Sequence, residues 1–286
     1  MEPGWLIEPF TLGFMRRALA GCLALSLAGP PLGVLLVLRR MSLTSDVLQH
    51  GILPGIALGA VVGGISVWAM GIGGVLAGFA VALLSGWLAR AAGGHEDAQL
   101  AGVYLVALAL GVAIVSATRG VDLAHLLFGS VLAVDNGALL LMACAASVAL
   151  VGLALIWRPL VLESFDPGFL RALGGRGGAW HLAFMALVVV VVVGGFAALG
   201  TLMSVGLMML PAVAARHLAR SLAGQVRAAV VVAVAASVGG LELSYHADIP
   251  AGPAIVLGAG ALWGGALLLG PHASLRAWLY RPHYRR

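Results

Sequence analysis

The chain alternates long apolar stretches with short polar ones along almost its whole length. The apolar stretches cover about residues 17–38, 47–69, 71–90, 99–117, 137–157, 180–200, 201–215, 227–243 and 253–270. Most of them approach the ~20 apolar residues that a membrane-spanning helix needs. The sequence GTLMSVG interrupts the stretch from 180 to 215, which is either one long broken helix or two short ones. The pattern therefore predicts eight or nine spans.

The apolar runs are continuous and do not alternate with the period of two that a membrane barrel requires. Composition supports helices in a bilayer: 62% of the 286 residues are hydrophobic, 9% are charged and the mean hydropathy is +1.07. Soluble domains contain about 25% charged residues. We predict an all-α, polytopic membrane protein with one transmembrane domain over residues 1–286.

Every basic residue is an arginine, and most arginines stand at the ends of apolar runs. This placement is typical of topology determinants and not of nucleic-acid binding. The arginine-bearing segments at 158–176 and 216–227 and the tail from 276 are therefore predicted to be cytoplasmic. The charges do not decide the side of the N-terminus. Cys22 and Cys144 lie in apolar runs and are predicted to be buried thiols, not a disulfide.

Polar residues interrupt the start of the second span in MSLTSDVLQH, residues 41–50. Asp46 and His50 are four residues apart, so a helix places them on one face. Two such side chains can bind a divalent metal such as Zn²⁺, Mn²⁺ or Fe²⁺, bind a proton, or bond to each other. The structural alternative is that Asp46 caps the helix and His50 bonds to a carbonyl. Ionisable residues in spans favour a functional role. Pro54 is predicted to loosen the helix one turn later.

Three further stretches carry polar clusters. Residues 119–135 place Asp122 and His125 on one face of a short surface helix, where they either cap it or line the mouth of a pore. Residues 241–260 gather Glu242, His246 and Asp248 near a span end, as a water-facing loop or as metal ligands. Residues 210–224 predict a short arginine-bearing cytoplasmic helix, either an ordinary loop helix or a docking element for a partner.

The sequence lacks the motifs that enzymes and ATPases carry. No glycine cluster is followed by Lys-Ser/Thr, and there is no nucleophile elbow, HExxH or CxxC. We therefore expect neither ATP hydrolysis nor other catalysis in this chain.

Five stretches in order resemble one family, the permease subunits of bacterial ABC importers for zinc, manganese and sometimes iron. They are LRRMSLTSDVLQHGILPGIALG, DLAHLLFGSVLAV, ESFDPGFLRALG, VGLMMLPAVAARHLA and LSYHADIPAGPAIVL, within about residues 12–271. The resemblance implies the helical fold of these permeases and a multi-pass protein of the bacterial inner membrane. It places Asp46 and His50 in the metal path, and we add Asp122 and His125 as candidate metal-path residues.

The resemblance also implies partners. Two copies of the chain form the pathway, a cytoplasmic ABC ATPase hydrolyses ATP, and an extracytoplasmic solute-binding protein delivers Zn²⁺ or Mn²⁺, the transported substrate; no cofactor is bound permanently. The ATPase docks on a coupling helix at about 214–222. The residues expected to couple this helix to the ATPase are Ala214, Ala215, Arg216, His217, Leu218 and Arg220.

Two alternatives remain at this stage. A permease for a metal chelate, such as cobalamin or a siderophore, would have a wider path without an ion-ligand pair. A secondary transporter would couple protons or sodium ions through Asp46.

Overall fold

The computed structural model describes residues 8–64, 66–92, 96–117, 132, 134–172, 177–272 and 274, and these residues form helices without a strand. A 3₁₀ turn, η1 (Glu8–Thr11), comes before the first helix. The long helices are α1 (Gly13–Leu38), α4 (Val67–Ala92), α5 (Glu96–Ala117), α7 (Asn136–Phe165), α9 (Gly177–Leu199), α10 (Thr201–Leu218), α11 (Leu222–Ala247) and α12 (Ala251–Leu269). The short helices are α2 (Thr44–Gly51), α3 (Leu53–Gly63) and α8 (Pro167–Ala172).

Nine helical segments of the described chain are long and apolar enough to cross a membrane. They follow the nine apolar stretches of the sequence, and α2 and α3 together make the second of them. The stretch from 180 to 215 is two spans because Gly200 ends α9 and precedes α10 with a φ of 86°. Glycine adopts this left-handed backbone without steric cost. The prediction of an all-α polytopic protein is confirmed, with the higher of the two span counts.

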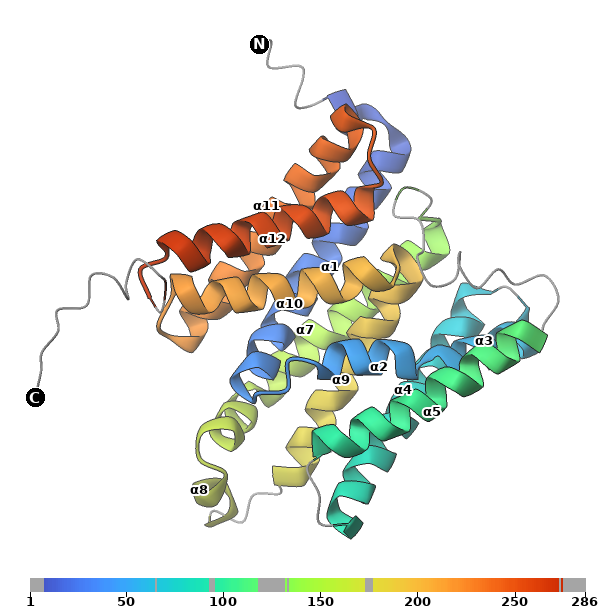
Figure 1. The fold of residues 1–286 in the computed structure, drawn as a ribbon, viewed down its shortest axis with the longest axis vertical. Helices are drawn as coiled ribbons and strands as arrows, with labels where there is room; N and C mark the ends of the chain where they lie inside the picture. Colours follow the sequence, from blue (N-terminus) through green and yellow to red (C-terminus); the bar gives the residue numbers. More distant parts are fainter. Residues whose placement is uncertain are drawn as a thin grey trace, which may run out of the picture.

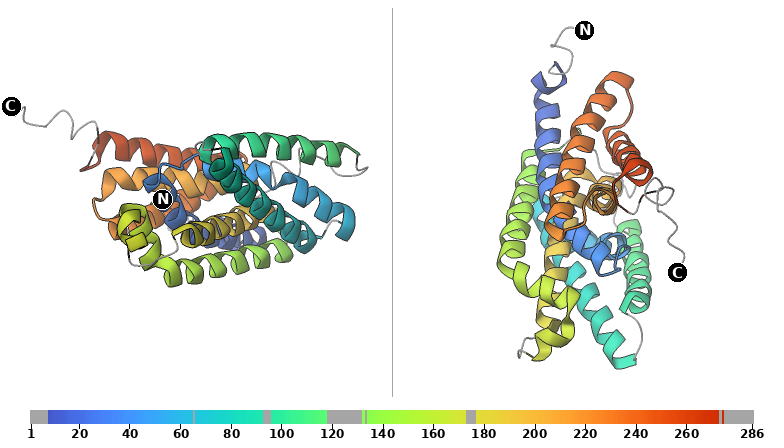
Figure 2. Two further views of the ribbon diagram at one scale, coloured as in Figure 1. Left: turned by 90° about the horizontal axis from the view of Figure 1, so that it is seen from below. Right: turned by 90° about the vertical axis from the view of Figure 1, so that its left-hand side faces the viewer.

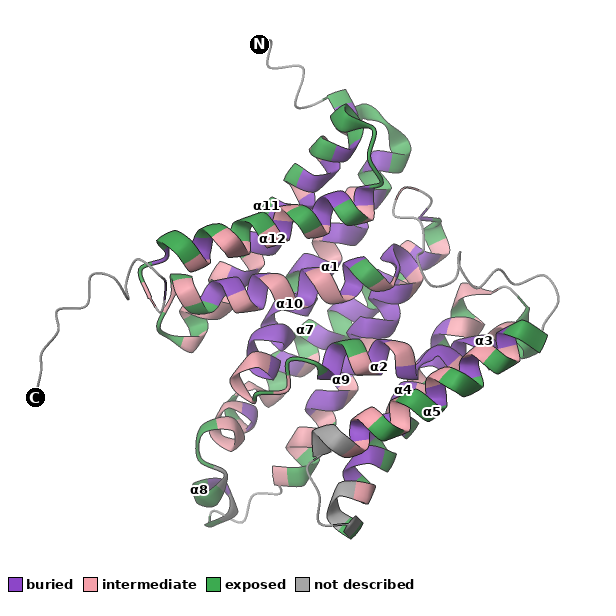
Figure 3. Cartoon of the chain, in the orientation of Figure 1, coloured by how far each residue is buried: buried purple, intermediate pink, exposed green. Residues whose placement is uncertain are grey.

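Helices α1 and α9 form the centre of the bundle, and their most apolar windows are each 72% buried. Figure 1 shows α10 and α12 crossing in front of α1, with α3, α4 and α5 grouped to one side. Figure 2 shows α7 and α12 on opposite faces of the bundle, with α1 between them. Burial follows this arrangement, since the central helices are mostly buried and the outer ones alternate between buried and exposed residues (Figure 3).

Small residues allow the helices to approach closely, as expected in membrane bundles. A Cβ added at Gly55 on α3 would clash with the carbonyl oxygen of Gly73 on α4. A Cβ at Gly33 on α1 would clash in the same way with the carbonyl oxygen of Met208 on α10. Glycine is therefore required where these two pairs of helices touch. Gly102 differs, since nothing lies within 4 Å of an added Cβ there.

Contacts between helix ends fix the direction of several helices. Arg39, just after α1, bonds to Glu163 and Ser164 near the end of α7 and to His181 near the start of α9. Hence α1 and α7 run in the same direction and α9 runs against them. The backbone of His272 donates to the carbonyl of His217, which places the end of α12 beside the end of α10.

Candidate metal site in the second span

Helix α2 is a short helix with one buried and one open face. Thr44, Ser45, Leu48 and Gln49 are buried against the bundle, and α2 packs on α4, α5 and α9. The helix stops at Ile52, and α3 begins with Pro54 in its first turn. The predicted loosening at this proline is therefore present as a break between two helices. In Figure 1, α2 lies on the front of the bundle between α10 and α5.

Asp46 and His50 lie on the open face of α2, one turn apart. The Nε2 atom of His50 is 3.8 Å from Oδ1 of Asp46, and the side chains are 34% and 58% exposed. Leu43 holds the N-cap position, and no side chain caps this helix. The alternative in which Asp46 caps the helix is therefore wrong. Asp46 is exposed, whereas the His50 ring is half-buried, with Nε2 toward Asp46 and Nδ1 buried without a hydrogen-bond partner.

The spacing of the pair suits one divalent ion. Metal bonds to imidazole nitrogen and carboxylate oxygen are about 2.1 Å long, so two ligands of one ion lie up to about 4.2 Å apart. The observed 3.8 Å falls within this limit. No group of three His, Cys, Asp or Glu side chains that could hold a metal occurs in the part of the chain that the structure describes. As a candidate site, the pair would supply two ligands and leave the rest of the coordination open, which suits an ion that must also leave.

The other predicted polar clusters have different outcomes. Asp122 and His125 lie outside the described residues. On α11, the Nε2 atom of His246 is 3.4 Å from Oε2 of Glu242, so these two do form a pair. Asp248 follows as the left-handed C-cap of α11, with a φ of 54°. The three side chains do not form a metal-ligand group.

The predicted coupling segment at 214–222 is a corner between two helices. Residues 214–218 are the last turn of α10, Ala219 is extended, and α11 begins at Leu222 with Ser221 as its N-cap. The prediction of one helix over 214–222 is therefore corrected. Ala214 and Ala215 are fully buried. The exposed residues of this corner are Arg216, Leu218, Arg220 and Ser221.

Arg39 has a structural role that the sequence did not indicate. Its guanidinium lies 2.9 Å from the Glu163 carboxylate, donates to Ser164 Oγ at 2.9 Å and stacks 4.8 Å from the centre of the Phe184 ring. These contacts hold the corner between α1 and α2 against α7 and α9. Arg39 and Arg40 are adjacent and identical in type, so the sequence does not show which of the two packs into the bundle.

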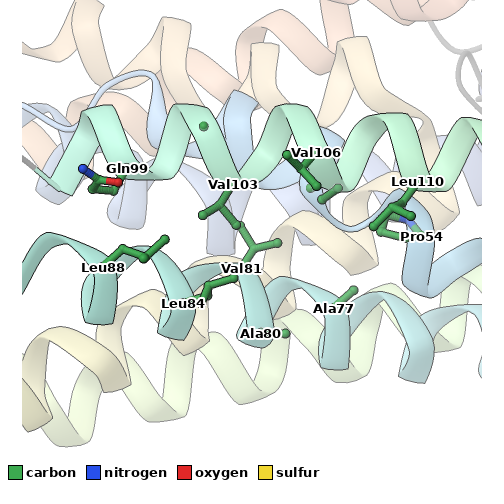
Figure 4. Close-up of a pocket in the computed structure, with 13 residues that line it drawn as sticks. Pro54, Ala77, Ala80, Val81, Leu84, Leu88, Gln99, Val103, Val106 and Leu110 are labelled. Atoms are coloured by element: carbon green, nitrogen blue, oxygen red, sulfur yellow. The ribbon is translucent and has the colours of Figure 1, made fainter. Parts of the chain in front are cut away.

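An apolar cavity of about 460 Å³ begins next to the pair, between α4 and α5 (Figure 4). Gly51 and Pro54 close it on the side of α2 and α3. Its remaining lining residues are Ala77, Ala80, Val81, Leu84, Leu88, Gln99, Gly102, Val103, Val106, Ala107 and Leu110. Gln99 is the one polar side chain among them, so the cavity suits apolar chains and not an ion. The candidate ion site is therefore the face of α2 and not this cavity.

Comparison with known proteins gives consistent matches over most of the chain. The model of the family described as "ABC 3 transport family" matches residues 11–269. The manganese transport system membrane protein MntC of Halalkalibacterium halodurans is 29% identical over 260 residues, which are 90% of this chain and 88% of MntC. The manganese import system permease protein ScaB of Streptococcus parasanguinis is 30% identical over 245 residues, covering 85% of this chain and 86% of ScaB.

A protein of Haemophilus influenzae named "Probable iron transport system membrane protein" is 29% identical over 254 residues, covering 88% of this chain and 92% of that protein. Among solved structures, PsaBC from Streptococcus pneumoniae in complex with Fab has a chain that superposes with a TM-score of 0.83 at 26% identity. The match covers 95% of this chain and 97% of that one. These matches span nearly the whole length of both partners.

Proposed function

The chain belongs to the ABC 3 transport family, and we propose that it is the permease subunit of an importer that carries Mn²⁺ across the bacterial inner membrane. The observation that carries this proposal is the Asp46–His50 pair, open on one face of a membrane-spanning segment and spaced for one divalent ion. A carboxylate and an imidazole suit first-row divalent metals. Fe²⁺ and Zn²⁺ fit the same donors and are the competing substrates.

The orientation follows from the number of spans and the arginines. Helices α1, α4, α7, α10 and α12 end on one side if the nine spans alternate. Eight arginines of the described chain lie at that side: Arg39, Arg40, Arg90, Arg158, Arg171, Arg216, Arg220 and Arg227. Arg16 and Arg17 lie at the opposite end of α1. Positive residues mark the cytoplasmic side, so the N-terminus is extracytoplasmic.

The partners follow from this orientation. A second copy of the chain supplies another Asp46–His50 pair across the open face of α2 and completes the ligands of the ion. The ATPase docks on the cytoplasmic corner between α10 and α11, where Arg216, Leu218 and Arg220 are accessible. The solute-binding protein docks at the opposite end and releases the ion into the pathway.

Transport follows alternating access. The ion loses part of its water shell to Asp46 and His50 and binds only when both are deprotonated. ATP binding draws the two ATPase subunits together, and the corner at 214–222 transmits that motion to α10 and α11. The site then opens toward the cytoplasm and the ion leaves, because no closed set of ligands holds it.

The alternatives receive less support. A solved chain described as part of an inward-facing metal-chelate type ABC transporter superposes with a TM-score of 0.64 at 18% identity, which is a likeness of fold alone. A chelate path has no need of an ion-ligand pair. A secondary transporter has no need of an ATPase, whereas the family is one of ABC transporters.

The test is uptake of radioactive Mn²⁺ by proteoliposomes that contain the chain with its ATPase and binding protein. We expect ATP-dependent uptake that the Asp46→Ala, His50→Ala double variant lacks. Arg40→Ala serves as a control, because Arg40 is exposed and outside both helices. Uptake by the double variant at the parent rate under limiting Mn²⁺ would contradict the site, and uptake without ATP would contradict the class.

A further inference from the structure

Buried polar atoms without a hydrogen-bond partner are concentrated on α2. The described residues contain seven such side-chain atoms, and four of them are on this helix of eight residues. They are Thr44 Oγ1, Ser45 Oγ, Gln49 Nε2 and His50 Nδ1. Unpaired buried polar atoms cost free energy and normally have a functional or structural explanation. Their concentration beside the Asp46–His50 pair points to the ion pathway.

Gln49 is the residue of this group whose position comes nearest to that of a metal ligand. It stands at i+3 from Asp46 and so is its neighbour along the helix, at the edge where the buried face of α2 meets the open face. Three residues turn a helix by about 300°, which places Gln49 about 60° from Asp46. The Gln49 side chain is long enough to cross this angle toward the pair.

The present position of Gln49 leaves its amide nitrogen unpaired. The residue is 1% exposed, and that nitrogen makes no hydrogen bond. A rotation toward Asp46 and His50 therefore breaks no bond of that nitrogen. Asp46 and His50 need no large movement, since they already lie together on the open face.

We propose that the carboxamide oxygen of Gln49 is a third ligand of the transported ion and biases the site toward Mn²⁺ over Zn²⁺. Carboxylate and carbonyl oxygens suit Mn²⁺, whereas a site with more nitrogen or sulfur suits Zn²⁺. Gln49 makes the donor set of each chain two oxygens and one nitrogen. This inference rests on the proposed function, because it names a selectivity residue of the same site.

The experiment compares Gln49→Leu with Gln49→Glu in the reconstituted transporter. Gln49→Leu replaces the carboxamide with an apolar group and keeps a side chain of similar size. Gln49→Glu keeps an oxygen atom at the same distance from the backbone. We measure the Zn²⁺ concentration that halves uptake of radioactive Mn²⁺. The expected result is that Gln49→Leu lowers this concentration on the order of tenfold, the scale of losing one supporting metal interaction, and that Gln49→Glu does not lower it.

Ser204→Ala is the matched control, because Ser204 Oγ is also buried and unpartnered but lies on α10. It should leave the Zn²⁺ concentration unchanged. Gln49→Asn, which shortens the side chain by one methylene, should give an intermediate value and replaces the leucine variant if that one does not fold.

The result that overturns this inference is an unchanged Zn²⁺ concentration in a folded Gln49→Leu or Gln49→Asn protein. Asp46→Asn distinguishes this failure from failure of the proposed function. If Asp46→Asn abolishes uptake while the Gln49 variants behave as the parent, the ion pair stands and Gln49 is only a packed side chain. If Asp46→Asn transports normally, the proposed site itself is wrong.

Discussion

The guanidinium of Arg39 lies 2.9 Å from the carboxylate of Glu163, and the two side chains are only 9% and 14% exposed. The contact joins the end of α1 to α7, and the same guanidinium meets His181 Nδ1 of α9 at 3.2 Å. A buried ion pair with several hydrogen bonds is costly to break from one side, because the remaining charge stays buried without a partner.

Arg39→Ala should therefore destabilise the protein by about 3 kcal/mol, through the unpaired Glu163 carboxylate. The measurement is the unfolding free energy of the purified chain in detergent. Arg40→Ala removes the same charge one residue later at an exposed site and should change stability by less than about 0.5 kcal/mol. Adding Glu163→Ala to Arg39→Ala should cost less than the sum of the two single changes. Additive costs would show that the pair does not couple these helices.

Gly200→Ala should destabilise the junction between α9 and α10. The backbone of Gly200 has a φ of 86° and a ψ of 171°, a conformation found almost only in glycine that costs a residue with a Cβ about 1–3 kcal/mol. Gly239→Ala is the comparison, because Gly239 lies inside α11 with nothing within 4 Å of an added Cβ. That change should be neutral or stabilising by up to about 1 kcal/mol. Equal melting temperatures for the two variants in detergent would argue against the strain.

Gly55→Ala should separate α3 from α4. The added Cβ would meet the carbonyl oxygen of Gly73, a backbone atom that has no side-chain freedom to move away. Overpacking of this kind costs about 1–3 kcal/mol. Because α3 follows directly after α2, Mn²⁺ uptake should fall as well. Gly260→Ala meets open space and should preserve both stability and uptake; a loss there equal to that of Gly55→Ala would contradict the packing argument.

Ser26 and Ser237 share a buried hydrogen bond of 3.0 Å between their hydroxyl oxygens, which links α1 to α11. Interhelical hydrogen bonds in membrane proteins contribute about 0.6 kcal/mol on average. Ser26→Ala and Ser237→Ala should each lower the unfolding free energy by about this amount. The double variant should lose no more than either single one, because one bond is removed in all three. A double loss equal to the sum would mean that each hydroxyl has its own separate partner.

The sequence alone determined the class of the protein and most of its spans. Long apolar runs in lipid can satisfy their backbone only as helices, so run length and spacing predicted the nine segments without knowledge of their packing. The i, i+4 spacing of Asp46 and His50 likewise placed the pair on one face, since helix geometry is local.

Only the tertiary structure decided which faces of these helices are covered. It turned Arg39 inward onto Glu163 while Arg40 stayed exposed, and it buried Ala214 and Ala215 in the corner predicted to face a partner. It also buried Gln49, with its amide nitrogen unpaired, beside an open Asp46. Burial depends on contacts between helices far apart in the chain, and in lipid apolar composition is the same on the inner and outer faces of a helix. Hydropathy therefore locates a span but does not show which of its faces packs against a neighbour.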